Sequence, residues 1–338
     1  MLIADLCDVP VAQAPMAGGP GGVNLAAAVS GAGGFGFLAA GYKTADAVRA
    51  EIAELRGRTD RPFGVNVFVP ESTPVDLAAV ARYADLVRPE ADALGVAPGE
   101  PVGGDDGWDA KLALLAELAP AVVTFTFGCP PAAAVAALRA AGCRVGVTVT
   151  SPAEAGAAAA AGVDGLVVQG PDAGAHRGTW ANAGTPPDTD LLSLLAQVRA
   201  VTDLPLVAAG GLMDGADIGA VLAAGAEAAA LGTAFLACPE SDAHPLHKAA
   251  VRTAGETVVT RAFSGRPARA LRNHWTDTYA EAAPAAYPHL NQITGPLRRA
   301  AAAGGDTTRM SLYVGAAHSR ARPLPAADLL TLLATELR

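Results

Sequence analysis

Residues 140–168 read AAGCRVGVTVTSPAEAGAAAAAGVDGLVV, and this stretch shows the pattern that decides the fold. An alanine-rich run ends at Gly142 before the apolar run 145–149, and a second one ends at Gly162 before the apolar run 165–168. Glycine supplies the left-handed turn that ends many helices. Short apolar runs without alternation are typical of parallel strands that are covered on both faces. The stretch therefore predicts a strand, a helix and a strand, and the pattern returns at 223–232.

The same pattern continues over residues 11–232 and predicts a TIM (β/α)8 barrel. The predicted strands are Val11–Ala14, Gly34–Phe37, Gly64–Val69, Val122–Phe125, Val145–Val149, Gly165–Val168, Leu206–Ala209 and Ala228–Gly232. The predicted helices are Val23–Ala32, Ala45–Arg56, Val75–Leu94 with Trp108–Leu118, Ala132–Ala141, Pro152–Ala161, Asp188–Val201 and Asp214–Ala224. A doubly wound sheet is the rival architecture, but it often carries GxGxxG after its first strand, and that motif is absent here.

The composition changes after the eighth predicted strand. Residues 238–305 are richer in Pro, His and Arg and have a weak strand signal, so we expect a small, mostly helical lid inserted after that strand. An ordinary packing extension is the alternative. Leucines at helical spacing in 326–337 predict a last barrel helix. We therefore expect the barrel to comprise residues 1–237 and 306–338.

Charge and composition exclude several classes of function. The net charge is −9 and basic residues form only short pairs such as Arg298-Arg299, which argues against a nucleic-acid partner. No apolar stretch is long enough to span a membrane, and the first residues do not resemble a signal peptide, so we expect a cytoplasmic protein. The four cysteines are isolated, and their spacing predicts neither a metal site nor a disulfide framework.

The loop after the sixth predicted strand contains the first candidate for catalysis. Residues 165–168 are apolar, Gln169 follows, and a glycine-rich loop then leads to His176. Active sites of barrels lie at the carboxyl ends of the strands, and histidine can transfer a proton near neutral pH. The alternative is a surface loop with a solvated histidine. The other five histidines are expected to have structural roles.

Two further loops indicate a phosphate site. Gly210 and Gly211 follow the seventh predicted strand, while Gly232 and Thr233 follow the eighth. Barrels often hold phosphate between these two loops, where backbone N–H groups at helix starts face the anion. Each loop alone is equally consistent with simple turns, but the two together favour a ligand that carries phosphate.

Polar residues on other strands suit a flat heterocycle. Asn66 lies within the third predicted strand, and Gln169 ends the sixth. A buried amide needs hydrogen-bond partners, which either the backbone or a ligand provides. The small residues around Pro15, Met16 and Ala17, after the first strand, allow a ring to lie against the backbone. An edge with alternating donors and acceptors, as in a flavin, fits such a site.

These motifs together resemble the nitronate monooxygenases, formerly called 2-nitropropane dioxygenases. The resemblance implies a TIM barrel with non-covalent FMN and oxidation of alkyl nitronates, and of nitroalkanes, by O₂ to a carbonyl compound and nitrite. It implies that His176 is the catalytic base or orients the substrate. The residues that it assigns to FMN are Pro15, Met16, Ala17, Asn66, Gln169, Gly174, Gly210, Gly211, Gly232 and Thr233.

The chain departs from the family pattern at three positions. Ala175 stands where a second glycine commonly precedes the histidine, Thr126 where many members have histidine, and Ala316 where a glutamine is expected. Two other functions remain open: a related FMN enzyme that uses NAD(P)H, similar to flavin-dependent enoyl-acyl-carrier-protein reductases, and a non-catalytic barrel that binds a phosphorylated ligand. We expect a monomer or a homodimer.

Overall fold

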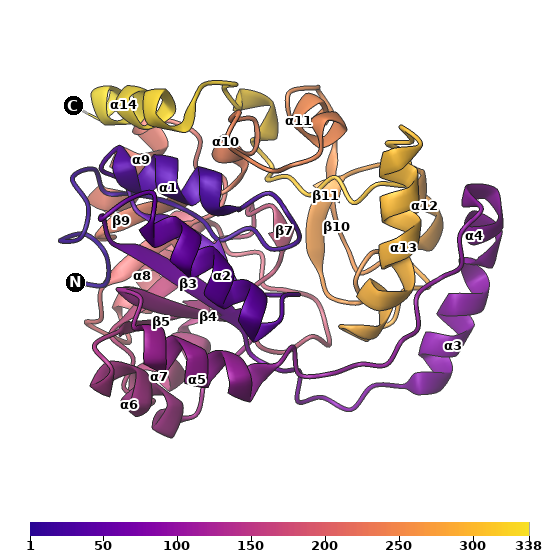
Figure 1. Cartoon of the computed structure of the whole chain (residues 1–338), viewed down its shortest axis with the longest axis horizontal. Coiled ribbons are helices and arrows are strands. Elements are labelled where there is room, and N and C mark those ends of the chain that lie inside the picture. The colour runs from indigo at the N-terminus through magenta and orange to yellow at the C-terminus, as the bar shows by residue number, and fades with distance from the viewer. Residues whose placement is uncertain (338) are drawn as a thin grey trace.

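The computed structural model describes residues 1–337, and its centre is a barrel of eight parallel strands (Figure 1). Around the barrel the strand order is β1-β9-β8-β6-β5-β4-β3-β2. A parallel bridge between Ala12 and Phe35 closes the remaining gap between β1 and β2. The strands are β1 (Val11–Gln13), β2 (Gly36–Ala39), β3 (Phe63–Phe68), β4 (Val122–Thr126), β5 (Arg144–Val149), β6 (Gly165–Gln169), β8 (Leu206–Ala209) and β9 (Ala228–Leu231). The predicted TIM barrel is confirmed, because each predicted strand overlaps an observed one.

Helices surround this barrel, and several begin at the residues that the sequence indicates. Ser151 accepts a hydrogen bond from the Glu154 backbone at 3.3 Å, and Asp214 accepts one from Asp217 at 3.1 Å. Such caps satisfy amide hydrogens that the first turn leaves free. The barrel helices are α1 (Val23–Gly31), α2 (Ala45–Arg56), α5 (Trp108–Leu118), α6 (Ala132–Ala140), α7 (Pro152–Ala160), α8 (Leu191–Arg199), α9 (Gly215–Ala223) and the tail helix α14 (Ala326–Glu336).

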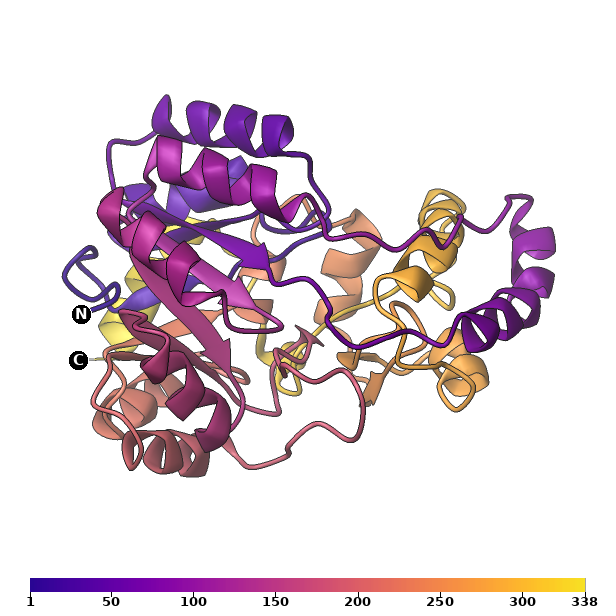
Figure 2. The ribbon, with the colours of Figure 1, turned by 90° about the horizontal axis from the view of Figure 1, so that it is seen from below.

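A second hydrophobic core lies outside the barrel and corrects one prediction. The helix expected at Val75–Leu94 is two helices, α3 (Leu77–Leu86) and α4 (Arg88–Leu94), which lie away from the barrel (Figures 1 and 2). They pack against α12 (His274–Tyr279) and α13 (His289–Ala303), which follow β9. The helices lie there because Val80 and Tyr83 are buried in this second core instead of against the strands.

A small sheet connects the second core to the barrel mouth. β10 (Thr257–Thr260) pairs antiparallel with β11 (Ala268–Leu271), which pairs in turn with β7 (Ala175–His176). The segment expected to be mostly helical therefore also contains a hairpin. Its remaining helix is α11 (Pro245–Val251). The short helix α10 (Thr233–Leu236) precedes this segment, and the 3-10 helix η1 (His318–Arg320) lies in the return to the barrel. The hairpin places residue 176 against the barrel mouth.

Candidate active site

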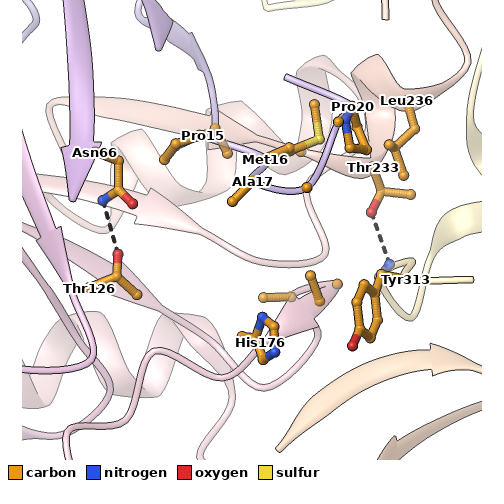
Figure 3. A pocket seen from close by; sticks show the side chains of 18 of the residues that line it. Pro15, Met16, Ala17, Pro20, Asn66, Thr126, His176, Thr233, Leu236 and Tyr313 are labelled. Atoms are coloured by element: carbon orange, nitrogen blue, oxygen red, sulfur yellow. Dashed lines mark hydrogen bonds between the residues drawn. The ribbon is translucent and has the colours of Figure 1, made fainter. Parts of the chain in front are cut away.

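A cavity of about 930 Å³ lies where the barrel mouth meets the second core. All of the residues that the sequence selected for the site line this cavity. Figure 3 shows the loop with Pro15, Met16 and Ala17 on one side of the cavity and His176 on the other. The volume is within the range of small-molecule and cofactor sites. The fold thus brings together Asn66 of β3 and Gln169 of β6 with residues from the loops after β1, β6, β8 and β9.

The glycine loops have a geometry that other residues would not adopt. The φ angles of Gly210 and Gly211 are +109° and +78°, a region that L side chains rarely occupy. A Cβ on Gly174 would lie 2.5 Å from the Gly315 nitrogen, and Gly315 itself donates to the Thr233 hydroxyl at 2.9 Å. These loops form a closely packed wall of backbone that a phosphate can approach. The expected glutamine position, Ala316, is exposed outside that wall.

The Asn66 amide is buried and belongs to a polar chain across three strands. Its Nδ2 donates to Thr124 Oγ1 and to Thr126 Oγ1, each at 3.0 Å, and Thr126 Oγ1 lies 3.2 Å from Thr148 Oγ1. The amide hydrogens therefore have partners within the protein, and the amide oxygen faces the cavity (Figure 3). Thr126, one of the three departures, orients this amide.

Gln169 holds the loop that carries the candidate histidine. Its Nε2 donates to the backbone oxygen of His176 at 3.2 Å, and its Oε1 accepts from the Gly178 backbone at 2.8 Å. Both polar atoms of the side chain thus contact the residues on either side of Arg177. The amide that the sequence suggested as a flavin ligand also positions β7.

His176 has a defined hydrogen-bond partner. Its Nε2 lies 2.8 Å from Ser264 Oγ, and Ser264 Oγ donates to the backbone oxygen of Arg266 at 3.2 Å. In the tautomer that donates from Nε2 to this serine oxygen, the serine hydrogen is free for the second bond. The ring nitrogen Nδ1 then carries the lone pair and is able to accept a proton.

The surroundings of His176 keep the imidazole neutral. Burial, followed by the positive charges of Arg266 and Arg298, lowers its pKa from 6.5 to about 3. Both effects disfavour the imidazolium. Three aromatic rings lie around the imidazole with centroids 5.5–5.8 Å away, those of Phe127, Tyr287 and Tyr313.

Two residues of this site were missed by sequence reasoning. Tyr313 lines the cavity, and its buried hydroxyl has no hydrogen-bond partner within residues 1–337. Arg298 also lines the cavity, and its guanidinium donates to Thr294, Ser311 and Asn291, with no carboxylate within 4.0 Å in the described chain. Both residues lie far along the sequence from the barrel motifs. The short pair Arg298-Arg299 was the only signal.

Two non-glycine residues beside the cavity have left-handed backbone conformations. Ala175 has φ +60° and Phe127 has φ +79°. The departure at Ala175 therefore places a Cβ where glycine would be unstrained.

Within the described residues there is no His, Cys, Asp and Glu cluster suited to a metal ion, and no helix is long and apolar enough to cross a membrane.

Comparison with known proteins agrees with this geometry. The family model described as nitronate monooxygenase matches residues 2–336. A nitronate monooxygenase of Pseudomonas aeruginosa is 40% identical, over 97% of this chain and 96% of that protein. A nitroalkane oxidase structure from Streptomyces ansochromogenes is 51% identical with a TM-score of 0.96, covering 100% of this chain and 98% of the other. FabK from Thermotoga maritima is 29% identical with a TM-score of 0.77, covering 99% and 95%. The chain therefore belongs to the nitronate monooxygenase family of oxidoreductases.

Proposed function

We propose that this protein binds FMN and oxidises alkyl nitronates, and nitroalkanes after deprotonation, by O₂ to a carbonyl compound and nitrite. The observation that carries the proposal is the position of a neutral His176 at the wall of a cavity of about 930 Å³ lined by all the residues selected from the sequence. Family membership and the similarity to a nitroalkane oxidase support the same reaction.

The walls of the cavity fit FMN. Gly210, Gly211, Gly232 and Thr233 line the cavity and would hold the phosphate through backbone N–H groups. The loop of Pro15, Met16 and Ala17 would lie against the ring, and the free amide oxygen of Asn66 would accept from its edge. When bound, FMN supplies the electron transfer and the reaction with O₂ that amino-acid side chains do not provide.

The opposite wall would hold the substrate. The Nδ1 atom of His176 accepts the α-proton of a neutral nitroalkane. The negative charge of the resulting nitronate then stabilises the imidazolium, which burial alone disfavours. The unpartnered Tyr313 hydroxyl donates to a nitro oxygen, and the Arg298 guanidinium supplies positive charge on the same side. Aromatic rings around the imidazole exclude water from the proton-transfer step.

The test is the absorption spectrum of the purified protein. We expect flavin bands that bleach when a nitronate is added without oxygen, and a heat-released cofactor that comigrates with FMN. Nitrite should form once O₂ is admitted. Release of FAD, or a colourless protein that takes up no FMN, contradicts the proposal. Rapid bleaching by NAD(P)H alone would favour the reductase alternative.

Assembly and location are part of the same proposal. The net charge of −9 and the absence of a membrane-spanning helix within residues 1–337 are compatible with a cytoplasmic monomer or homodimer. Sedimentation velocity determines the assembly state. Cell fractionation with antibody detection determines the location, and recovery in the membrane fraction would contradict the proposal.

A further inference from the structure

The small sheet beside the barrel mouth has two faces with different chemistry. In its ladder, His176 is opposite Ala268 and Ala175 is opposite Arg269. Side chains of a strand alternate between faces, so Arg269 and His176 lie on opposite faces. The Arg177 backbone nitrogen donates to the Pro267 oxygen at 2.8 Å and continues this pairing. Arg177 therefore shares the face of Arg269, away from His176.

A second cavity, of about 340 Å³, lies on that face. Three arginines line it: Arg177, Arg261 and Arg269. Arg261 follows the end of β10, two residues after Val259, which is opposite Arg269 in the hairpin. The two cavities have no lining residue in common, so this one is separate from the candidate active site.

The three guanidinium groups contact only neutral acceptors. No carboxylate lies within 4.0 Å of any of them in the described part of the chain, and the single acidic residue in the cavity wall is the exposed Asp188. Arg269 donates to Thr257 Oγ1 at 2.9 Å, and the other bonds are to backbone oxygens. Those oxygens belong to Gly170, Pro171, Asn182, Gly184 and Pro187.

Several donors of these groups remain free. Each guanidinium carries five N–H donors, and the buried Nε of Arg261 has no partner among residues 1–337. Burial, and then the positive charge of Arg269, lower the pKa of Arg177 to about 10, although the negative charges of Glu154 and Asp172 act in the opposite direction. A bound anion would relieve the repulsion between Arg177 and Arg269 and would occupy the free donors.

We propose that Arg177, Arg261 and Arg269 form a binding site for a phosphate group, either as the free ion or on a small phosphomonoester. Planar guanidinium groups bind phosphate oxygens through paired N–H donors. The volume is at the lower end of the range for small-molecule sites, which excludes a large ligand. The site lies on the outer face of the strand that carries His176, so its occupancy should order the loop from Gly170 to Asp190.

The experiment is calorimetric titration of the protein carrying one equivalent of FMN, with inorganic phosphate and with glycerol phosphate, at constant ionic strength set by chloride. Arg261→Gln and Arg269→Gln should each raise Kd at least about tenfold, because each removes charge-assisted hydrogen bonds. The matched control is Arg272→Gln, since Arg272 lies beside the same hairpin but is exposed and paired with Glu256 and Asp277. Its Kd should not change.

The two ligands separate the two sources of the group. Tighter binding of glycerol phosphate indicates a phosphomonoester, and equal or tighter binding of inorganic phosphate indicates the free ion. No binding of either ligand, or a Kd that both variants leave unchanged, overturns the proposal.

Hydrogen–deuterium exchange of the wild type provides a test that depends on no variant. We expect phosphate to protect residues 171–188 and 257–269. Protection confined to the loops of Gly210 and Gly232 would place the anion in the flavin cavity and would overturn the proposal.

Discussion

At the scale of single residues, the role that we propose for His176 is proton transfer. His176→Asn should lower activity on neutral nitroalkanes by about 10²–10⁴-fold, because a general base is lost. Nitronates prepared in advance need no deprotonation and should lose less. FMN should remain bound, since His176 holds neither the phosphate nor the ring edge. Steady-state kinetics with matched pairs of nitroalkane and nitronate measure the difference, and equal losses on both forms would assign His176 to orientation instead.

The low pKa of His176 also predicts the pH dependence. Its pKa of about 3 means that the imidazole of the free enzyme is the neutral, proton-accepting form throughout the range from pH 5 to 8. The profile of kcat/KM for a nitroalkane should then show no protonation of His176 in that range. A wild-type profile that falls on acidification with a midpoint near the ordinary histidine pKa would contradict the desolvated environment of His176, provided that this step is missing from the profile of His176→Asn.

Replacing Tyr313, whose hydroxyl is unpartnered, should affect substrate binding without lowering the free energy of unfolding. Tyr313→Phe removes a polar atom that has no partner in the described chain, so the free energy of unfolding should stay the same or rise. The KM for a nitronate should rise about tenfold if the hydroxyl donates to the nitro group. Urea unfolding and kinetics are measured on the same preparation. An unchanged KM would remove Tyr313 from the substrate site.

At the scale of elements, the strand β7 holds His176 in place, and the left-handed conformation of Ala175 puts strain on this strand. The left-handed conformation costs roughly 1–2 kcal/mol for a residue with a Cβ, and glycine loses about 0.5–1 kcal/mol through the entropy of the unfolded chain. Ala175→Gly, at φ +60°, should therefore stabilise the protein slightly. Urea unfolding checks this. Gly174→Ala is the opposite control. Its added Cβ would lie 2.5 Å from the Gly315 nitrogen, so this variant should have a lower free energy of unfolding.

Gln169 is the residue that joins β6 to β7. Gln169→Ala removes two hydrogen bonds to the loop, each worth about 0.5–1.5 kcal/mol net. Backbone amides at residues 176–178 should exchange faster with deuterium, and kcat should fall more than FMN affinity. If FMN affinity falls and the exchange of this loop does not change, then Gln169 acts as a flavin ligand and not as a support for β7.

At the scale of the whole molecule, the sequence predicts the barrel well and the second core poorly. Apolar runs and terminal glycines locate strands because buried parallel strands are apolar on both faces. The amphipathic pattern around Val80 and Tyr83 is the same whether a helix packs on the strands or elsewhere, so it does not distinguish α3 from a barrel helix. Arg298 and Tyr313 reach the cavity only through tertiary packing, which no local pattern encodes.

The second core depends on a buried carboxylate that connects separate segments. Glu90 of α4 is 6% exposed and accepts from His274 at 2.7 Å, from Tyr279 at 2.8 Å and from Arg309. Burial would raise the pKa of Glu90, but these hydrogen bonds outweigh burial and lower it. The folded state therefore releases the proton of Glu90 more readily than the unfolded state. The stability from this group is present above the unfolded pKa and is lost as pH falls through the folded pKa.

Glu90→Gln tests this connection because it imitates protonation at every pH. At pH 7 the variant should lose about 1–3 kcal/mol of unfolding free energy, since the charged acceptor of Arg309 is gone. The difference between wild type and variant should shrink as pH falls through the lowered pKa of Glu90, because the wild-type carboxylate then becomes protonated. Urea unfolding at several pH values, followed by tryptophan fluorescence to which Trp275 of the same core contributes, measures it. Glu117→Gln is the control, because its exposed pair with Arg49 should contribute little. A difference that stays constant with pH would mean that packing around Glu90, and not its charge, holds the second core beside the barrel mouth.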